Sequence, residues 1–236
     1  MDVRHIEIAD YFIQAISQGL YQEGDRIPSE AELHVLFGAR RSVLRRAVAR
    51  LEETGWVTTH QGKGSFVTSR KAPIDYELSS KTAFSSIMKE KGMVPRAALL
   101  HWEKRAAKQH EQDQLALDID ETVYALEILR STGDVPLSVT TTVMPAYLVP
   151  GLEAHLTGFH SLYALLSRSY RLQPRRLKSI VRAALPEPQD AQILNMADHA
   201  PILQIESLVT HRGVDLMEYS ISRIRGDLNK SCVTFD

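Results

Sequence analysis

PSEAELHVLFGARRSVLRRAVARLEETGWVTTHQGKGSFV, residues 28–67, is the stretch that decides the fold of the first part of this chain. Ser29 and Glu32 have the spacing of a capping box, in which each side chain accepts a hydrogen bond from the other residue's backbone N–H. This box predicts a short helix that ends at Gly38, because glycine readily adopts the left-handed conformation that follows a helix. Apolar residues at helical spacing from about Arg41 onward predict a second helix. Two helices joined by so short a glycine-containing turn are typical of a helix-turn-helix.

The flanking segments complete a small domain. Residues 3–20 carry apolar side chains at helical spacing and predict an amphipathic helix. Two short strand-like segments surround the turn Gln61-Gly62-Lys63-Gly64 and predict a β-hairpin, the wing. We therefore predict a winged helix-turn-helix over residues 1–68. The buried face of its capped helix is expected to consist of Leu33, Leu36 and Phe37.

Basic side chains gather on the second helix of this motif, although the whole chain is nearly neutral, with 28 Lys and Arg against 29 Asp and Glu. The arginines on or just before the helix are Arg40, Arg41, Arg45, Arg46 and Arg50, and no acidic residue lies between Arg40 and Leu51. A helix that enters the major groove presents donors near its N-terminal end, where arginine can bind guanine edges and phosphates. The alternative is a merely solvated helix face, but the position of this helix favours DNA binding.

The remainder of the chain predicts a second domain over residues 79–236. We interpret residues 69–78 as a linker, because they lack a helical period and contain Pro73. Hairpin-like pairs of segments around Gly133-Asp134 and Arg212-Gly213 indicate an antiparallel sheet. Helices are predicted near residues 79–92, 109–117, 161–170 and 187–195. The predicted fold class is α+β.

Several classes of function lack support in the sequence. Cys232 is the only cysteine, which excludes a disulfide framework or a cysteine metal cluster within one chain. The nine histidines form no close pair, so we expect no metal site, and we expect no cofactor and no catalytic residues. We also expect a cytoplasmic protein without a membrane partner, because neither a signal peptide nor a long apolar run is visible.

Residues 28–67 resemble the signature of the GntR family of bacterial transcription regulators. That signature is roughly P-S-E, an apolar helix, G-V-S-R-x-T-V-R-x-A, an L-x-x-x-G-hydrophobic step and a Q-G-x-G-[ST]-[FY]-V wing. The resemblance implies that Arg41 and Arg45 contact bases, that Ser29 and Ser42 contact phosphates, and that Glu30 holds the arginines in place.

The same resemblance places the tip of the wing, Gly62 and Lys63 beside Gln61, in the minor groove. Arg40 departs from the signature, since the family usually has a small polar residue there, and it adds a guanidinium near the operator. We therefore include Arg40 and Gln61 among the predicted DNA-binding residues.

Residues from about 75 to 236 resemble the HutC-type effector domain, which shares its fold with chorismate lyase. Gly133-Asp134-Val135-Pro136-Leu137, Ser161-Leu162-Tyr163 and Glu218-Tyr219-Ser220 are among the matching segments. The resemblance implies that a ligand binds against one face of the sheet, beside Phe84, Ser85, Arg130, Ser161, Tyr163 and Glu218. A guanidinium and several hydroxyls suit a phosphate or another anion. Ile128 and Ile224 stand where many members have an arginine and a tyrosine, which makes this pocket less polar.

Four of the six predicted pocket residues also have a structural interpretation. Arg130 can be an ion-pair residue, Ser161 can simply cap a helix, and Tyr163 can belong to the core. Glu218 can pair with an arginine such as Arg223 instead of meeting a ligand.

Ile74-Asp75-Tyr76, Phe84-Ser85 and Arg175-Arg176 further resemble regulators of phosphonate-utilisation operons. The predicted function is a ligand-responsive repressor that binds double-stranded DNA at an inverted repeat and is released by a small phosphorylated or phosphonate metabolite. A homodimer held mainly by the effector domains is expected, because palindromic sites mirror two-fold symmetry. The alternative is an enzyme of the chorismate-lyase kind with an accessory DNA-binding head.

Overall fold

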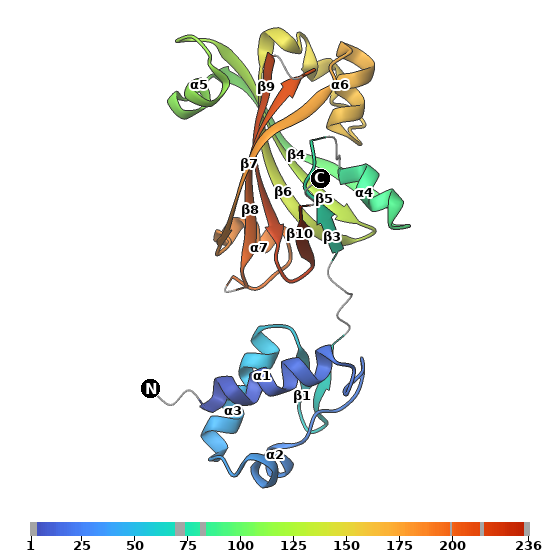
Figure 1. Ribbon diagram of the computed structural model, residues 1–236, viewed down its shortest axis with the longest axis vertical. Helices are drawn as coiled ribbons and strands as arrows, with labels where there is room; N and C mark the ends of the chain where they lie inside the picture. Colours follow the sequence, from blue (N-terminus) through green and yellow to red (C-terminus); the bar gives the residue numbers. More distant parts are fainter. Residues whose placement is uncertain (1–3, 69–73, 81–83, 199, 213–214, 234–236) are drawn as a thin grey trace. The chain divides into compact units, whose positions relative to one another are not determined.

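The computed structural model describes residues 4–68, 74–80, 84–198, 200–212 and 215–233. The chain divides into two compact units, Met1–Ala72 and Pro73–Asp236, each with its own hydrophobic core (Figure 1). Residues 69–73 of the expected linker lie outside the described residues. No helix within the described ranges is long and apolar enough to cross a membrane.

Three helices and a hairpin form the N-terminal unit. They are α1 (Arg4–Ser17), α2 (Glu30–Phe37), α3 (Arg41–Glu53), β1 (Val57–His60) and β2 (Gly64–Val67). Phe12, Leu33, Leu44 and Leu51 are almost completely buried between the helices, so each helix contributes an apolar stripe to one core. The arrangement confirms the predicted winged helix-turn-helix.

The short α2 buries less of its surface than predicted. Leu33 is fully buried and Phe37 packs against the same core, but Leu36 is 58% exposed. Leu33 and Phe37 are four residues apart and share one narrow face of this eight-residue helix, and Leu36 lies outside that face.

The wing is anchored to the segment that precedes α2. The N–H of Ile27 donates to the carbonyl of Ser65 and the N–H of Val67 donates to that of Asp25, so this segment extends the hairpin. Gly64 has a φ of +110°, and a Cβ atom there would lie 3.0 Å from Nε of Arg26. Glycine at this position therefore meets both a backbone and a packing requirement.

The second unit is built on a six-stranded antiparallel sheet with the strand order β4-β5-β6-β9-β8-β7. These strands are β4 (Pro95–Ala106), β5 (Thr122–Thr132), β6 (Val135–Pro145), β7 (Pro174–Ala184), β8 (Ile202–His211) and β9 (Asp215–Arg225). The strands β4-β5-β6 and β7-β8-β9 each form a meander, and the two meanders join where β6 pairs with β9. Strands with attached helices confirm the α+β class.

Helices pack on both faces of this sheet. The helix α6 (Leu162–Tyr170) shares a core with Leu126 and Ile128 of β5, while α4 (Phe84–Glu90) packs near Leu137 of β6. The opposite face carries α5 (Gln109–Leu115), which packs on Val123 and Val143, and α7 (Pro188–Ile193). Figure 1 shows α4 and α6 together on one side of the sheet and α5 on the other. Two 3-10 helices, η1 (Ala146–Leu148) and η2 (Leu152–His155), follow β6.

A second, two-stranded sheet corrects the predicted linker. β3 (Ile74–Glu77) pairs in parallel with β10 (Asn229–Cys232), although residues 74–78 were assigned to the linker and residues 229–232 to no strand. Each strand has only four residues, and each buries a single side chain, Ile74 or Asn229. Segments this short carry no readable period, and their pairing depends on residues far apart in the chain.

Candidate functional site

The N-terminal half of α3 presents polar side chains to solvent. Arg41, Ser42 and Arg45 are exposed, whereas Leu44 and Ala47 on the opposite side of the helix are buried. Arg40 occupies the N-cap position in an extended conformation and provides no side-chain cap. The first N–H groups of α3 therefore remain available to an anion such as a DNA phosphate.

Glu30 at the start of α2 orients Arg45. The Nε atom of Arg45 lies 2.9 Å from Oε1 and 3.1 Å from Oε2 of Glu30. This contact leaves both Nη groups, the atoms of a bidentate base contact, without a partner among the described residues. The resemblance implied that Glu30 holds both Arg41 and Arg45 in place. Among the described residues, the structure shows an ion pair of Glu30 with Arg45 only.

The remaining predicted DNA-binding residues lie at the ends of the same elements. Ser29 forms the predicted capping box with Glu32, and because its oxygen accepts the N–H of Glu32, its own O–H can still donate to a phosphate. The tip of the wing, residues 61–63, is exposed, and Gly62 has a φ of +76°. The predicted residues thus divide among the start of α2, the N-terminal half of α3 with its N-cap, and the wing tip.

A cavity of about 290 Å³ lies in the second unit, against the sheet face that α4 and α6 cover. Its lining includes every predicted effector residue: Phe84, Ser85, Arg130, Ser161, Tyr163 and Glu218. Ile128 and Ile224 also line it, at the two positions where the sequence departs from the family pattern. The structure therefore brings together six side chains that span 135 residues of the chain, from Phe84 to Glu218.

Arg130 is free of carboxylate partners among the described residues. Its Nη1 atom donates to Oγ1 of Thr140 at 2.7 Å, and its guanidinium lies 5.9 Å from the centre of the Phe84 ring. The structural alternative of an ion pair is thus not realised within the described chain.

Ser161 does cap α6, because its hydroxyl accepts from the N–H of Ala164 at 3.4 Å.

The charge of the cavity lining is predominantly positive. Lys89, Arg130 and Arg176 line it, together with Arg96, which pairs with Asp134 at 2.8 Å, and Glu218 is the one acidic residue among the described lining residues. An anion that enters this space meets an excess of basic groups in a partly desolvated site, where a charge-assisted hydrogen bond is strong.

Glu218 is an unusual residue for the middle of a sheet, because its side chain is buried. Oε1 accepts from Oγ1 of Thr142 at 3.4 Å, while Oε2 has no hydrogen-bond partner among the described residues. Burial raises the pKa of Glu218 above its ordinary value, against the opposing effects of Tyr163, Arg130 and Arg176. Burial therefore favours the neutral form of this carboxyl group beside the cavity.

Two alternative roles of the predicted residues can now be judged. Arg223 pairs with Asp190 and Glu127 on the opposite face of the sheet, at 2.9 and 3.1 Å, so it is not the partner of Glu218. Burial, followed by the charge of Glu218, raises the pKa of the Tyr163 hydroxyl well above its ordinary value. Tyr163 is thus a neutral hydrogen-bond donor at the cavity rather than only a core residue.

The sequence analysis missed a stripe of hydroxyls on the central strands. Ser138 and Thr140 of β6 and Ser220 and Ser222 of β9 line the cavity, and Thr140 and Ser222 are hydrogen-bonded at 2.9 Å. The signal that could have found them is polar residues at alternate positions of two predicted strands, which places them on one face. Arg176 was also absent from the predicted pocket, although Arg175-Arg176 had been noted for its resemblance.

The chain thus combines a helix-turn-helix unit with a second unit that holds a cavity of small-molecule size, as in the class of helix-turn-helix regulators with an effector domain. Residues 6–67 match the model for bacterial regulatory proteins of the gntR family, and residues 90–229 match the UTRA domain. The chain belongs to the GntR family and carries a UTRA domain as its second unit.

Relatives agree with this assignment along the chain. The probable transcriptional regulator PhnF of Escherichia coli K12 is 32% identical over 228 residues, which are 95% of this chain and 92% of the relative. The transcriptional regulator GgaR of the same strain is 27% identical over 226 residues, 95% of this chain and 88% of the relative. The crystal structure of PhnF from Mycobacterium smegmatis has the same fold, with a TM-score of 0.66 at 24% identity, over 97% of this chain and 99% of that chain.

Replacing Glu218 by glutamine should change the pH dependence of stability. Because the pKa of Glu218 is raised above 4.5 in the folded state, the wild type loses stability as the pH rises through and above 4.5. Glu218→Gln has no charge to bury and keeps an acceptor for Thr142, so its free energy of unfolding should increase relative to the wild type over this range. Urea unfolding of both proteins from about pH 4 to about pH 8 measures the difference.

The exposed Glu90 provides a matched control, since Glu90→Gln removes a carboxylate outside the cavity lining. A difference between Glu218→Gln and wild type that stays constant with pH would contradict the interpretation of Glu218 as a buried acid.

Proposed function

We propose that this protein represses transcription by binding an inverted-repeat operator as a homodimer, and that a small anionic metabolite in the cavity releases it. The observation that carries the proposal is that two features occur in one chain. The first is the exposed, arginine-rich helix α3, whose N-cap residue makes no side-chain cap, and the second is a cavity in which Arg130 has no carboxylate partner among the described residues. The site of action is the cytoplasm, where the operator is.

The proposed mode of DNA binding follows from α3. Arg41 and Arg45 stand near its N-terminal end, where a recognition helix reaches base edges in the major groove. Arg40 and Ser42 flank them and can contact phosphates, as can Ser29 at the start of α2. Lys63 at the wing tip adds a positive charge on a separate element.

The proposed effector is a compact molecule with a phosphate or phosphonate group. A volume of about 290 Å³ is at the lower end of the usual range for small-molecule sites and excludes a large sugar nucleotide. The segments that resemble regulators of phosphonate-utilisation operons contribute Tyr76, Phe84, Ser85 and Arg176 to the lining. Ile128 and Ile224 supply an apolar wall beside the anion.

Release requires that the effector bind more tightly to the form of the dimer that does not bind DNA, because only differential affinity shifts a population. The segment β3, which directly follows the connection to the DNA-binding unit, contributes Tyr76 to the cavity lining. Occupancy of the cavity can therefore act on the residues that lead toward the DNA-binding unit.

An enzyme of the chorismate-lyase kind is the alternative function. Glu218 and Tyr163 provide one acid and one neutral hydroxyl, and the cavity lining described here holds no second carboxylate to act as a base. The named regulators among the relatives favour the non-enzymatic function.

The edge strand β7 supports a dimer through the effector units. Leu177, Ile180 and Val181 are 60%, 48% and 44% exposed on a strand at the end of the sheet. A long edge strand with exposed apolar residues is a ready surface for pairing with a second chain.

A double variant of β7 tests this arrangement. Ile180→Glu with Val181→Glu should convert the dimer to a monomer at about 10 µM, because two carboxylates would be buried in the interface without partners. Light scattering measures the mass, and Leu100→Glu on the other edge strand, β4, is the control. A wild-type monomer, with and without DNA, rejects the homodimer, and dissociation of the Leu100 variant alone assigns the interface to the wrong edge.

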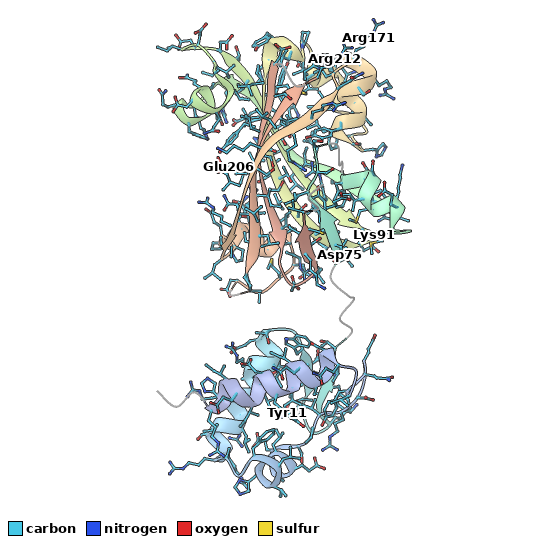
Figure 2. All side chains as sticks on the ribbon, in the orientation of Figure 1. Tyr11, Asp75, Lys91, Arg171, Glu206 and Arg212 are labelled. Carbon is cyan, nitrogen blue, oxygen red and sulfur yellow. The ribbon has the colours of Figure 1, made fainter. Side chains whose placement is uncertain are left out.

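Arg45→Ala tests the DNA contact. The variant should lose about 1–3 kcal/mol of operator affinity and should relax discrimination at one base pair, because Arg45 is proposed to read a base edge. Anisotropy titrations would use an operator selected from random duplexes by the wild type, together with single-base substitutions of that operator. Arg171→Ala is the control. Figure 2 shows Arg171 and Asp75, which lies near the start of the second unit, at opposite ends of that unit. An equal loss on all duplexes would assign Arg45 to a phosphate instead.

Arg130→Ala tests the effector site. The variant should keep operator affinity near that of the wild type and lose the release of DNA by the anionic effector, because the main charge-assisted donor is gone. The measurement is operator anisotropy during titration with phosphate esters, phosphonates and uncharged analogues, with Arg171→Ala as the control. If Arg130→Ala still responds, or if uncharged analogues release the wild type equally well, the anion pocket is wrong.

A further inference from the structure

Arg176 of β7 lines the cavity and carries an unsatisfied donor. Its Nε atom is buried and has no hydrogen-bond partner among the described residues. Its Nη1 atom donates to the carbonyl of Ser79 at 3.0 Å, and its backbone N–H donates to the carbonyl of Ser80 at 3.0 Å. The side chain is thus held in place at the cavity while part of its hydrogen-bonding capacity stays unused.

An unused guanidinium N–H of this kind is costly. A buried polar group without a partner loses its hydration and gains nothing in return, and the cost is larger for a charged group. None of the ion pairs between described residues involves Arg176. A bound anion would supply the missing acceptor.

Arg130 and Arg176 line the same cavity on one face of the sheet and come from strands on either side of its centre. Arg130 stands on β5 and Arg176 on the edge strand β7, with β6, β9 and β8 between them. Both guanidiniums line the cavity and both lie close enough to the buried Glu218 of β9 to favour its ionised form. A small ligand above the central strands would therefore lie between two arginines.

We propose that Arg176 is a second anion-binding side chain of this cavity and that Arg130 and Arg176 together select an acid group with two negative charges, such as a phosphonate or a phosphate monoester. A sulfonate has the same tetrahedral shape but carries only one charge, so it would balance the charge of only one of the two guanidiniums. The proposal rests on the proposed function of the cavity as an effector site and adds the residue that sets its charge selectivity.

Glu218 defines the other end of the preferred ligand. Its Oε2 atom is a second buried atom without a partner in the described chain, and it is an acceptor when ionised. A ligand that carries an amine or hydroxyl at a short distance from its acid group would satisfy both orphaned atoms. 2-Aminoethylphosphonate and 2-aminoethanesulfonate form a matched pair of probes, since they share this skeleton and differ in the charge of the acid group.

Calorimetry with the full chain at about pH 8 tests the selectivity. The wild type should bind the phosphonate at least about tenfold more tightly than the sulfonate, the effect of one additional charge-assisted contact. Arg176→Gln should bring the two affinities to within about threefold of each other, mostly by weakening the phosphonate. Arg176→Lys keeps the charge without the guanidinium fork and should fall between.

Operator binding verifies that the variants are folded, and Arg175→Gln, an exposed neighbour on the same strand, is the matched control. If Arg176→Gln retains the wild-type preference while Arg130→Ala loses binding, the role of Arg176 is overturned and the effector site stands. If the wild type binds neither probe nor any phosphate ester or phosphonate of the effector panel, the anionic effector site itself is overturned. Should Arg176→Gln fail to bind operator, the Arg176→Lys preference decides: an unchanged ratio overturns the proposal, and a reduced ratio supports it.

Discussion

The antiparallel pairing of β6 with β9 is the contact on which the second unit depends. Each half of the sheet is a meander of neighbouring strands, and only this pairing joins them into one surface. The register sets Thr140 opposite Ser222 and Thr142 opposite Ser220, so the hydroxyls of both strands lie on one face. Because side chains alternate along a strand, the same register sends Arg223 to the other face, where it meets Asp190 and Glu127.

Burying polar side chains on this face of the sheet costs free energy unless each of them forms a hydrogen bond. Thr140, Thr142, Ser220 and Glu218 are buried in the part of the sheet where a stable core would place aliphatic residues. Hydrogen bonds satisfy some of them, as in the series from Arg130 to Thr140 to Ser222, but Oε2 of Glu218 remains without a partner among the described residues. Sites that break the usual rules of burial in this way are where function is expected.

The sequence was informative where a local pattern carries a physical meaning. The capping box at Ser29 and the left-handed Gly38 are local, and both are present in the structure. The family resemblance placed six residues at one cavity, which no local rule could have done, because they come from two helical segments, α4 and α6 with its N-cap, and from two strands, β5 and β9.

Prediction failed where the deciding contact is distant or weak. β3 and β10 pair over more than 150 positions, and neither has a period of its own. Leu36 looked apolar enough for the core, but an eight-residue helix covers only one narrow face. Arg175-Arg176 was noted only for its resemblance to regulators of phosphonate-utilisation operons, and only the fold shows that Arg176 of β7 lines the cavity.

Arg176 also explains why the cavity and the start of the second unit are physically one structure. The strand β7 would be an isolated edge near its beginning, but Arg176 bonds Ser79 with its side chain and Ser80 with its backbone. These serines follow β3, whose pairing with β10 fixes the point at which the chain enters the unit. A ligand that draws on the Arg176 guanidinium would compete with, or reinforce, its bond to Ser79. Arg176, the proposed anion-binding residue, and the residues that begin the unit therefore share one hydrogen-bonding group.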